Sequence, residues 1–300
     1  MGLLMAAGAV VGALGCQKER GEVQDREAGK SQMHLVDALG REIVLEKTPQ
    51  RLISLAPNIT EILFAVGLGD KVVGVTSWDN YPPQVAKIER VGDYGNPNLE
   101  KIIWLKADLV LVAYGVPKSS IEAMEKHGLK VMALPDDSLE DVAKSMRMVV
   151  AACGDAASSF EARVAAVTGR TASLQPSEHP KVLFLISLEP IMCVGSKTFI
   201  SDMIEKAGGV NLGASFGENY PNVSAEALVE KRPDMLFLAE DLGKKAKTQE
   251  GKEILRKLGL VDVPAHALAD DLTQRPGPRA VEGLEEMARL LHPGVFAPLK

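Results

Sequence analysis

The sequence predicts an α/β protein of two similar lobes joined by one helix. Short apolar runs alternate with longer stretches of helical periodicity, which is typical of βαβ units and a mainly parallel sheet. These runs fall into two sets, one on each side of a single amphipathic segment, and the second set repeats features of the first. The repetition indicates a diverged structural duplication.

Seven apolar runs are expected to be strands. The first set is residues 51–55, 72–75, 109–113 and 130–134, and the second is 182–186, 235–239 and 263–268. Between them, from Asp155 to Leu174, apolar residues recur at three- or four-residue steps with charge on the other faces, which predicts one long helix. We expect an N-terminal lobe over 33–153, a linker helix over 154–176 and a C-terminal lobe over 177–300.

The first sixteen residues carry no charge and form an apolar run that is too short for a permanent membrane span. Small residues precede Cys16, and the polar segment 17–32 follows it, which resembles a bacterial lipobox and a flexible tether. We therefore expect residues 1–16 to be a lipoprotein signal peptide. Cys16 would carry the lipid and hold the protein at the extracytoplasmic face of a bacterial membrane. The alternative is a buried N-terminal helix with an inert thiol.

Composition excludes several functions. The net charge of −6 and the scattered lysines leave no basic surface for nucleic acid. The three cysteines form no C-x-x-C pair and no Cys/His cluster with zinc-ligand spacing, so we expect no structural metal. Cys153 and Cys193 belong to opposite sides of the linker helix and are expected to be buried free thiols.

The duplication is clearest around two helix starts. Asn98 and Ser224 are good N-cap residues; each is followed two residues later by a glutamate and ten residues later by an aspartate. A carboxylate in the first turn is favoured by the helix dipole, which is the ordinary explanation of Glu100 and Glu226. Because both lobes place the same charge at the same point, we expect these two glutamates to dock the protein onto a partner.

Aromatic residues are scarce but concentrate in loops that follow predicted strands. Ligands of open α/β sheets bind beyond the carboxyl ends of the strands, so an aromatic-lined cleft follows, although some rings could only cover loop bases. Trp104, in contrast, has apolar neighbours within a helix and is expected in the core. The loop aromatics are Trp78, Tyr81, Tyr94, Tyr114 and Tyr220.

Two further segments carry functional side chains. Arg275 and Arg279 precede the final predicted helix; we assign Arg275 to an anionic ligand group and Arg279 to structure. Ser215 lies in a G-x-S-x-G string, the only catalytic motif, but no strand leads directly into it and no helix starts on it. The five histidines are dispersed. An exported serine hydrolase is therefore a distant alternative, and we expect no enzyme.

The chain resembles the periplasmic-binding-protein family that serves cobalamin, ferric siderophore and haem uptake. The resemblance covers residues 34–292 and is carried by the segments 51–63, 67–75, 81–83, 91–92, 98–100 and 106–110. It implies two Rossmann-like lobes bridged by a single long α-helix, with a ligand cleft between the lobes. It also implies delivery of the ligand to the permease dimer of an ABC importer with its ATPase subunits, and arginines on the permease opposite Glu100 and Glu226.

Within that family the chain is most similar to cobalamin binders, through residues 75–84 and 98–102. The resemblance places Trp78, Tyr94 and Tyr220 at aromatic positions of the corrinoid cleft and Pro57 at the mouth of the first strand. Cys193 and Leu272 depart from the pattern, which has aromatic rings there. Haem, with Tyr94 or Met192 as axial ligand, and a ferric siderophore remain alternative cargoes. We expect no resident cofactor and a monomer.

Overall fold

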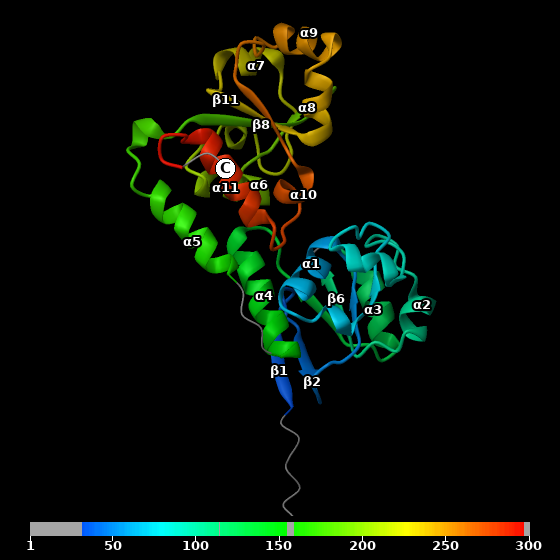
Figure 1. Ribbon diagram of the computed structural model, residues 1–300. Coiled ribbons are helices and arrows are strands. Elements are labelled where there is room, and N and C mark those ends of the chain that lie inside the picture. Colours follow the sequence, from blue (N-terminus) through cyan, green and yellow to red (C-terminus); the bar gives the residue numbers. More distant parts are fainter. Residues whose placement is uncertain (1–31, 114, 155–158, 297–300) are drawn as a thin grey trace, which may run out of the picture. The chain divides into compact units, whose positions relative to one another are not determined.

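The computed structural model describes residues 32–113, 115–154 and 159–296. It confirms the α/β fold: two five-stranded sheets and one two-stranded hairpin, all within the compact unit that begins at Gln32 (Figure 1). The hairpin, β1 (Met33–Val36) and β2 (Glu42–Leu45), precedes the first predicted strand.

The N-terminal lobe holds a parallel sheet of order β5-β4-β3-β6-β7. Helix α1 covers one face and helices α2 and α3 lie on the other (Figure 1). The bounds are β3 (Leu52–Ser54), α1 (Pro57–Ala65), β4 (Val72–Val75), β5 (Glu89–Arg90), α2 (Leu99–Trp104), β6 (Leu109–Ala113), α3 (Lys118–Lys126) and β7 (Val131–Leu134).

Both faces of this sheet are buried, which explains why its strands are continuous apolar runs. Successive residues of β6 and β7 alternate between two separate cores. Leu109, Leu111 and Met132 pack on the α1 side, whereas Val110 and Val112 pack with side chains from α2 and α3. The core on the α1 side continues through the connecting helices into the C-terminal lobe.

The C-terminal lobe contains the parallel strands β10-β8-β11-β12, with β9 antiparallel to β8. Helices α7, α8 and α9 lie on one side of this sheet, and α6 and α11 lie on the other (Figure 1). The bounds are β8 (Lys181–Leu188), β9 (Ile191–Cys193), α6 (Phe199–Lys206), β10 (Val210–Asn211), α7 (Ala225–Glu230), β11 (Met235–Ala239), α8 (Glu240–Ala246), α9 (Gln249–Lys257), β12 (Ala265–Leu268), α10 (Asp270–Thr273) and α11 (Ala280–Leu291).

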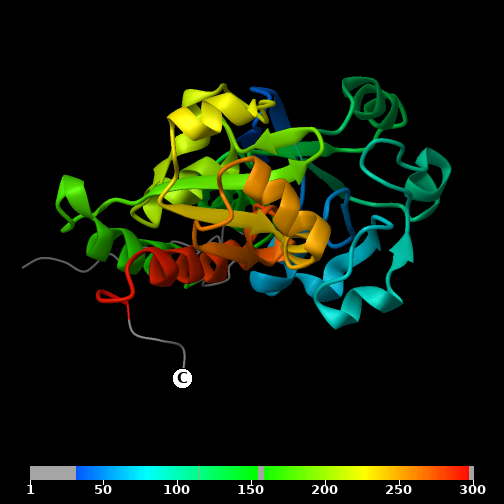
Figure 2. The same ribbon diagram turned by 90° about the horizontal axis from the view of Figure 1, so that it is seen from above.

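Two helices connect the sheets, α4 (Leu139–Cys153) and α5 (Phe160–Thr171). Of the single helix expected over residues 155–174, the structure shows α5; the expected end was too late, because residues 172–174 form a turn after the helix. Gly154 has φ of 118°, a conformation that favours glycine, and it ends α4. Helix α5 lies beside α11 (Figure 2), and Arg163 donates two hydrogen bonds to Glu285 there, at 3.0 and 2.9 Å.

The lobes repeat one topology, which confirms the predicted duplication. The order β4-β3-β6-β7 in the first sheet corresponds to β10-β8-β11-β12 in the second. The matched aspartates also have the same task, because each fixes the start of the central strand. Asp108 Oδ2 accepts from the amides of Gln50 and Arg51 at 2.8 and 3.0 Å, and Asp234 Oδ2 accepts from the amide of Lys181 at 2.8 Å.

Two expectations about single residues have opposite outcomes. Cys153 and Cys193 are buried free thiols, as predicted, and burial raises the pKa of each to about 11. The assignment of Trp104 to the core is wrong: its side chain is 72% exposed. Trp104 is the last residue of α2, and it lies on the side of the helix opposite the buried Ile102. No helix in the described ranges is long and apolar enough to cross a membrane.

Candidate functional site

The predicted ligand residues of the N-terminal lobe follow three neighbouring strands. Pro57 is the first residue of α1 after β3, Trp78 follows β4, and Tyr94 follows β5. Because these strands are parallel, the three residues lie at the carboxyl edge of the sheet, where α/β proteins bind ligands. Trp78 and Tyr94 are 65% and 50% exposed, so both rings leave surface free for a ligand. Tyr114 lies outside the described residues.

A buried carboxylate shapes the loop that carries Trp78. Asp79 is 3% exposed, and its Oδ2 accepts hydrogen bonds from the amide and the hydroxyl of Thr76 at 2.8 and 2.5 Å. Burial raises the pKa of Asp79 above its ordinary value and outweighs the hydrogen bonds from Thr76, which lower it. The amide of Ser77 donates to the Gly92 carbonyl at 2.8 Å, which ties this loop to the one that carries Tyr94.

Tyr220 is presented from the C-terminal lobe by a loop that pairs with β9 and the residues after it. The amide of Cys193 donates to Pro221 at 3.1 Å, and that of Gly195 donates to Asn219 at 2.7 Å. A Cβ at Gly195 would lie 1.7 Å from the carbonyl oxygen of Glu218, so only glycine permits this approach. Tyr220 is 48% exposed. The loops that carry Trp78, Tyr94 and Tyr220 are called the aromatic loops below.

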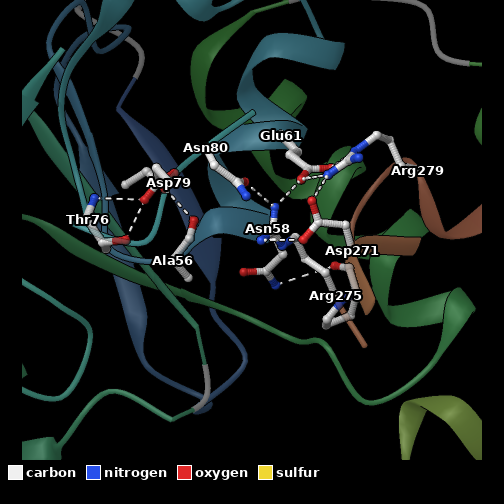
Figure 3. A network of polar contacts seen from close by, with 11 residues as sticks. Ala56, Asn58, Glu61, Thr76, Asp79, Asn80, Asp271, Arg275 and Arg279 are labelled. Carbon is white, nitrogen blue, oxygen red and sulfur yellow. Dashed lines mark hydrogen bonds and ion pairs between the residues drawn. The ribbon is translucent and has the colours of Figure 1, made fainter. Parts of the chain in front are cut away.

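A polar network joins the lobes beside the aromatic loops (Figure 3). Its centre is Glu61 of α1, whose side chain is 2% exposed. Arg279 donates to both Glu61 oxygens, at 2.9 and 2.7 Å, and Arg275 donates to Oε1 at 2.9 Å. Arg275 also contacts Asp271 at 2.8 Å and Asn80 at 2.9 Å. These five residues are called the bridging network.

The network gives the two arginines similar roles. Their side chains are 17% and 18% exposed, and both pair with Glu61 and Asp271. The hydrogen bonds that Arg279 donates to Glu61 raise the pKa of Arg279, and its guanidinium lies 4.0 Å from the ring centre of Tyr81. Arg275, which we expected to bind the ligand, therefore forms ion pairs that connect the two lobes.

A second carboxylate group lies next to this network, at the end of β7. Burial and the neighbouring charges of Asp137 and Asp141 raise the pKa of Asp136 to about 6, and a hydrogen bond from Asn58 lowers it. The side-chain nitrogen of Asn58 also donates to the Pro276 carbonyl across the lobes, at 3.4 Å. Ionisation of Asp136, at the junction of the lobes, is therefore unfavourable.

We expect Asp136→Asn to stabilise the protein at pH 7. The raised pKa means that the folded protein keeps a proton that the unfolded chain releases, so ionising Asp136 costs stability as pH rises from about 4 through about 6. The variant should gain roughly 1–3 kcal/mol at pH 7, and the gain should shrink toward pH 4. Urea denaturation at several pH values measures this, with the exposed Asp262→Asn as control. An equal gain at every pH would contradict the assignment.

A cavity of about 470 Å³ is lined in part by Glu61 and Arg279 of the bridging network. Phe64, Tyr81, Gln84, Arg163 and Arg279 are among its lining residues. It does not include Trp78, Tyr94 or Tyr220, and both of its arginines are already paired: Arg163 with Glu285 and Arg279 with Glu61. The aromatic loops therefore remain the candidate ligand surface.

Glu100 and Glu226 occupy equivalent places in the two lobes. Asn98 Oδ1 accepts from the Lys101 amide at 3.0 Å and Ser224 Oγ from the Ala227 amide at 3.2 Å, so both predicted caps are present. Backbone and Ser224 hydrogen bonds lower the pKa of Glu226, which keeps it ionised. In the part of the chain that the structure describes, neither glutamate forms an ion pair.

The structure gives no support to the catalytic alternative. Ser215 lies in the short 3-10 helix Leu212–Ser215, and its hydroxyl donates to the Leu212 carbonyl at 2.9 Å. His179 and His292 contact the Gly208 carbonyl oxygen instead, at 2.8 and 3.1 Å. Among the described residues no group of three or more His, Cys, Asp or Glu side chains could hold a metal ion.

Glu61, Asp271 and Asn80 were not predicted from the sequence as parts of the site. One signal was available for Glu61. It is the only charged residue of α1, and Ile59, Ile62 and Leu63 around it are core residues. A carboxylate on the buried face of a helix requires a cationic partner, which the arginines before α11 provide.

Two α/β lobes with exposed aromatic rings at the strand ends are typical of a solute-binding protein. The chain belongs to the periplasmic binding protein family, whose model matches residues 52–266. It is 32% identical to the uncharacterized ABC transporter substrate-binding lipoprotein YvrC of Bacillus subtilis, over 98% of this chain and 96% of that protein. A vitamin B12-binding protein of Vibrio parahaemolyticus is 30% identical over 79% of this chain and 88% of that protein.

Solved structures show the same fold. The periplasmic vitamin B12 binding protein BtuF of Vibrio cholerae superposes with a TM-score of 0.70 at 29% identity, covering 81% of this chain and 96% of that one. The periplasmic heme-binding protein RhuT of Roseiflexus gives a TM-score of 0.67 at 26% identity, covering 82% and 99%. The protein is therefore a substrate-binding protein of an ABC importer, and its fold is shared by binders of different metal chelates.

Proposed function

We propose that the protein binds cobalamin or a related corrinoid outside the cytoplasm and delivers it to an ABC importer. The observation that carries the proposal is the exposure of Trp78, Tyr94 and Tyr220 on loops of both lobes, in a chain with only 4% aromatic residues. Large flat ligands are held by such rings. The vitamin B12-binding relatives agree with this ligand class.

Haem is the second candidate, because Tyr94 exposes a phenol that can ligate iron and Met192 lies on β9, next to the Tyr220 loop. A ferric siderophore would need more free cationic groups than Arg275, which is already paired. Tyr94→Phe separates the first two, since it keeps the ring and removes the phenol oxygen. Titration calorimetry should show unchanged binding of cyanocobalamin by this variant. Tight binding of haemin that Tyr94→Phe abolishes would instead support haem.

We further propose that Cys16 is the lipidated N-terminus of the mature protein; it lies outside the described residues. The similarity to a lipoprotein over 98% of the chain supports this. The intact mass of protein extracted from membranes should equal that of a chain that begins at Cys16 and carries acyl chains. Cys16→Ser should release the protein from the membrane, whereas Cys153→Ser should not. A mass that contains residues 1–15 without acyl groups would disprove lipidation.

Docking onto the permease dimer is proposed for Glu100 and Glu226. They are exposed, unpaired among the described residues and repeated by the duplication, so they suit a partner with one basic pocket per subunit. Replacing both by Ala should impair transport into vesicles, with each single variant affected less, at normal cobalamin affinity. The defect should diminish at high ionic strength, where the wild type also loses this attraction. Glu122→Ala, an exposed carboxylate on α3, is the control. Wild-type transport by the double variant would exclude this role.

A further inference from the structure

Helices α2 and α7 expose the same face on the two lobes. Counted from the caps Asn98 and Ser224, the residue four places on is buried in each helix, and the residues two, five and six places on are exposed. Positions two, five and six are spaced as i, i+3 and i+4, so they lie together on one side of a helix. The duplication has therefore conserved a surface as well as a strand order.

The composition of this face is partly apolar. On α2 it consists of Glu100, Ile103 and Trp104, and on α7 of Glu226, Val229 and Glu230. Trp104 is 72% exposed, Val229 67% and Ile103 38%. Single exposed apolar residues are ordinary, but a carboxylate with an aliphatic residue one turn later, repeated on both lobes, is a feature of an interaction surface.

Ligand binding does not explain why these side chains are exposed. Trp104 and Val229 lie on helices, away from the strand ends that carry the aromatic loops. The cations next to Glu100 and Glu230 in the sequence are engaged: Lys101 pairs with Glu89, and the Lys231 ammonium lies 5.4 Å from the ring centre of Phe216. Neither Glu100 nor Glu226 forms an ion pair with another described residue, so each face offers a negative charge beside an apolar side chain.

We propose that these apolar side chains form the second half of the docking surface for the permease: Ile103 and Trp104 on α2, and Val229 on α7. The proposal rests on the docking role of Glu100 and Glu226. A two-fold partner that meets both lobes must present a cation next to an apolar patch in each subunit. Trp104 has Glu230 as its counterpart on α7, so the contact with the N-terminal lobe is the stronger of the two.

The indole of Trp104 also indicates which cation the permease presents to this face. Glu100 and Trp104 are four residues apart on one helix, so their side chains are neighbours. A guanidinium can bind the carboxylate through two hydrogen bonds and lie over the indole at the same time, which an ammonium cannot do as well. The N-terminal lobe therefore fits the arginine that the family resemblance implies, with apolar residues beside it.

The test measures the affinity of cobalamin-loaded protein for the host's cobalamin importer complex in nanodiscs. Trp104→Ala should weaken docking about tenfold, and Val229→Ala about two- to threefold. Trp104→Phe should restore most of the affinity. The matched control for Val229 is Val36→Ala, because Val36 is also 67% exposed but lies on the β1–β2 hairpin. Melting temperatures and cyanocobalamin affinity should stay at the wild-type value in all variants.

Ionic strength distinguishes the two halves of the surface. Raising salt from about 0.05 M to about 0.5 M should abolish the difference between wild type and the Glu100→Ala, Glu226→Ala double variant, while most of the Trp104→Ala defect persists. Unchanged docking of Trp104→Ala, with docking lost in the glutamate double variant, would overturn this inference alone. Self-association of the wild type that Trp104→Ala abolishes would identify a second copy of the chain as the partner and would also overturn it. Failure of the protein to bind cobalamin would refute the proposed function instead.

Discussion

Glu61→Ala is expected to lower the free energy of unfolding by about 3 kcal/mol, the largest stability effect of any single substitution proposed for the bridging network. Removing the carboxylate leaves the guanidiniums of Arg275 and Arg279 facing each other, with side chains only 17% and 18% exposed. Asp271 remains as a partner, which keeps the loss at the lower end for a buried pair. Urea denaturation followed by circular dichroism measures the change.

Two controls make this result specific. Glu61→Gln keeps the shape and a hydrogen-bond acceptor and should cost less than Glu61→Ala. Glu125→Ala removes the partner of Arg41 in an exposed pair and should cost about 1 kcal/mol or less. If Glu61→Ala costs no more than Glu125→Ala, the network does not hold the lobes together.

Alanine at Trp78, Tyr94 or Tyr220 is expected to weaken cobalamin binding about tenfold, and the triple variant should lose about a thousandfold if the effects add. Each ring loses a stacking contact worth roughly 0.5–1.5 kcal/mol beyond its burial. Folding should be unaffected because the rings are 65%, 50% and 48% exposed. Titration calorimetry measures the affinities.

Trp104→Ala is the matched control for ligand binding, since Trp104 is equally an exposed aromatic residue but lies on α2. Its cobalamin affinity should equal that of the wild type. Unchanged affinity in all three variants of the aromatic loops would remove these residues from the ligand site.

Much of the fold could be predicted because both faces of each sheet are covered. Strands such as β6 and β11 are then continuous apolar runs that stand out from their polar surroundings, and their predicted bounds, 109–113 and 235–239, are those observed. The duplication was visible because caps and aspartates have fixed local tasks. Asn98, Ser224, Asp108 and Asp234 perform them in the structure.

The remaining elements depend on contacts that no local pattern encodes. The two-residue strands β5 and β10 exist only through pairing with β4 and β8. Trp104 was misplaced because an apolar neighbourhood in the sequence does not reveal where a short helix ends. The bridging network escaped prediction because Glu61 and Arg275 are distant in the chain, and only the packing of α1 against the segment before α11 brings them together.

The central claim is that the cargo is a corrinoid. The most direct test is the visible absorption spectrum of the protein purified from its native host, because corrinoids, haem and ferric chelates absorb differently. The account predicts corrinoid bands that disappear from the triple variant of Trp78, Tyr94 and Tyr220 and persist in Trp104→Ala. A haem Soret band or a ferric charge-transfer band in place of corrinoid absorption would contradict it.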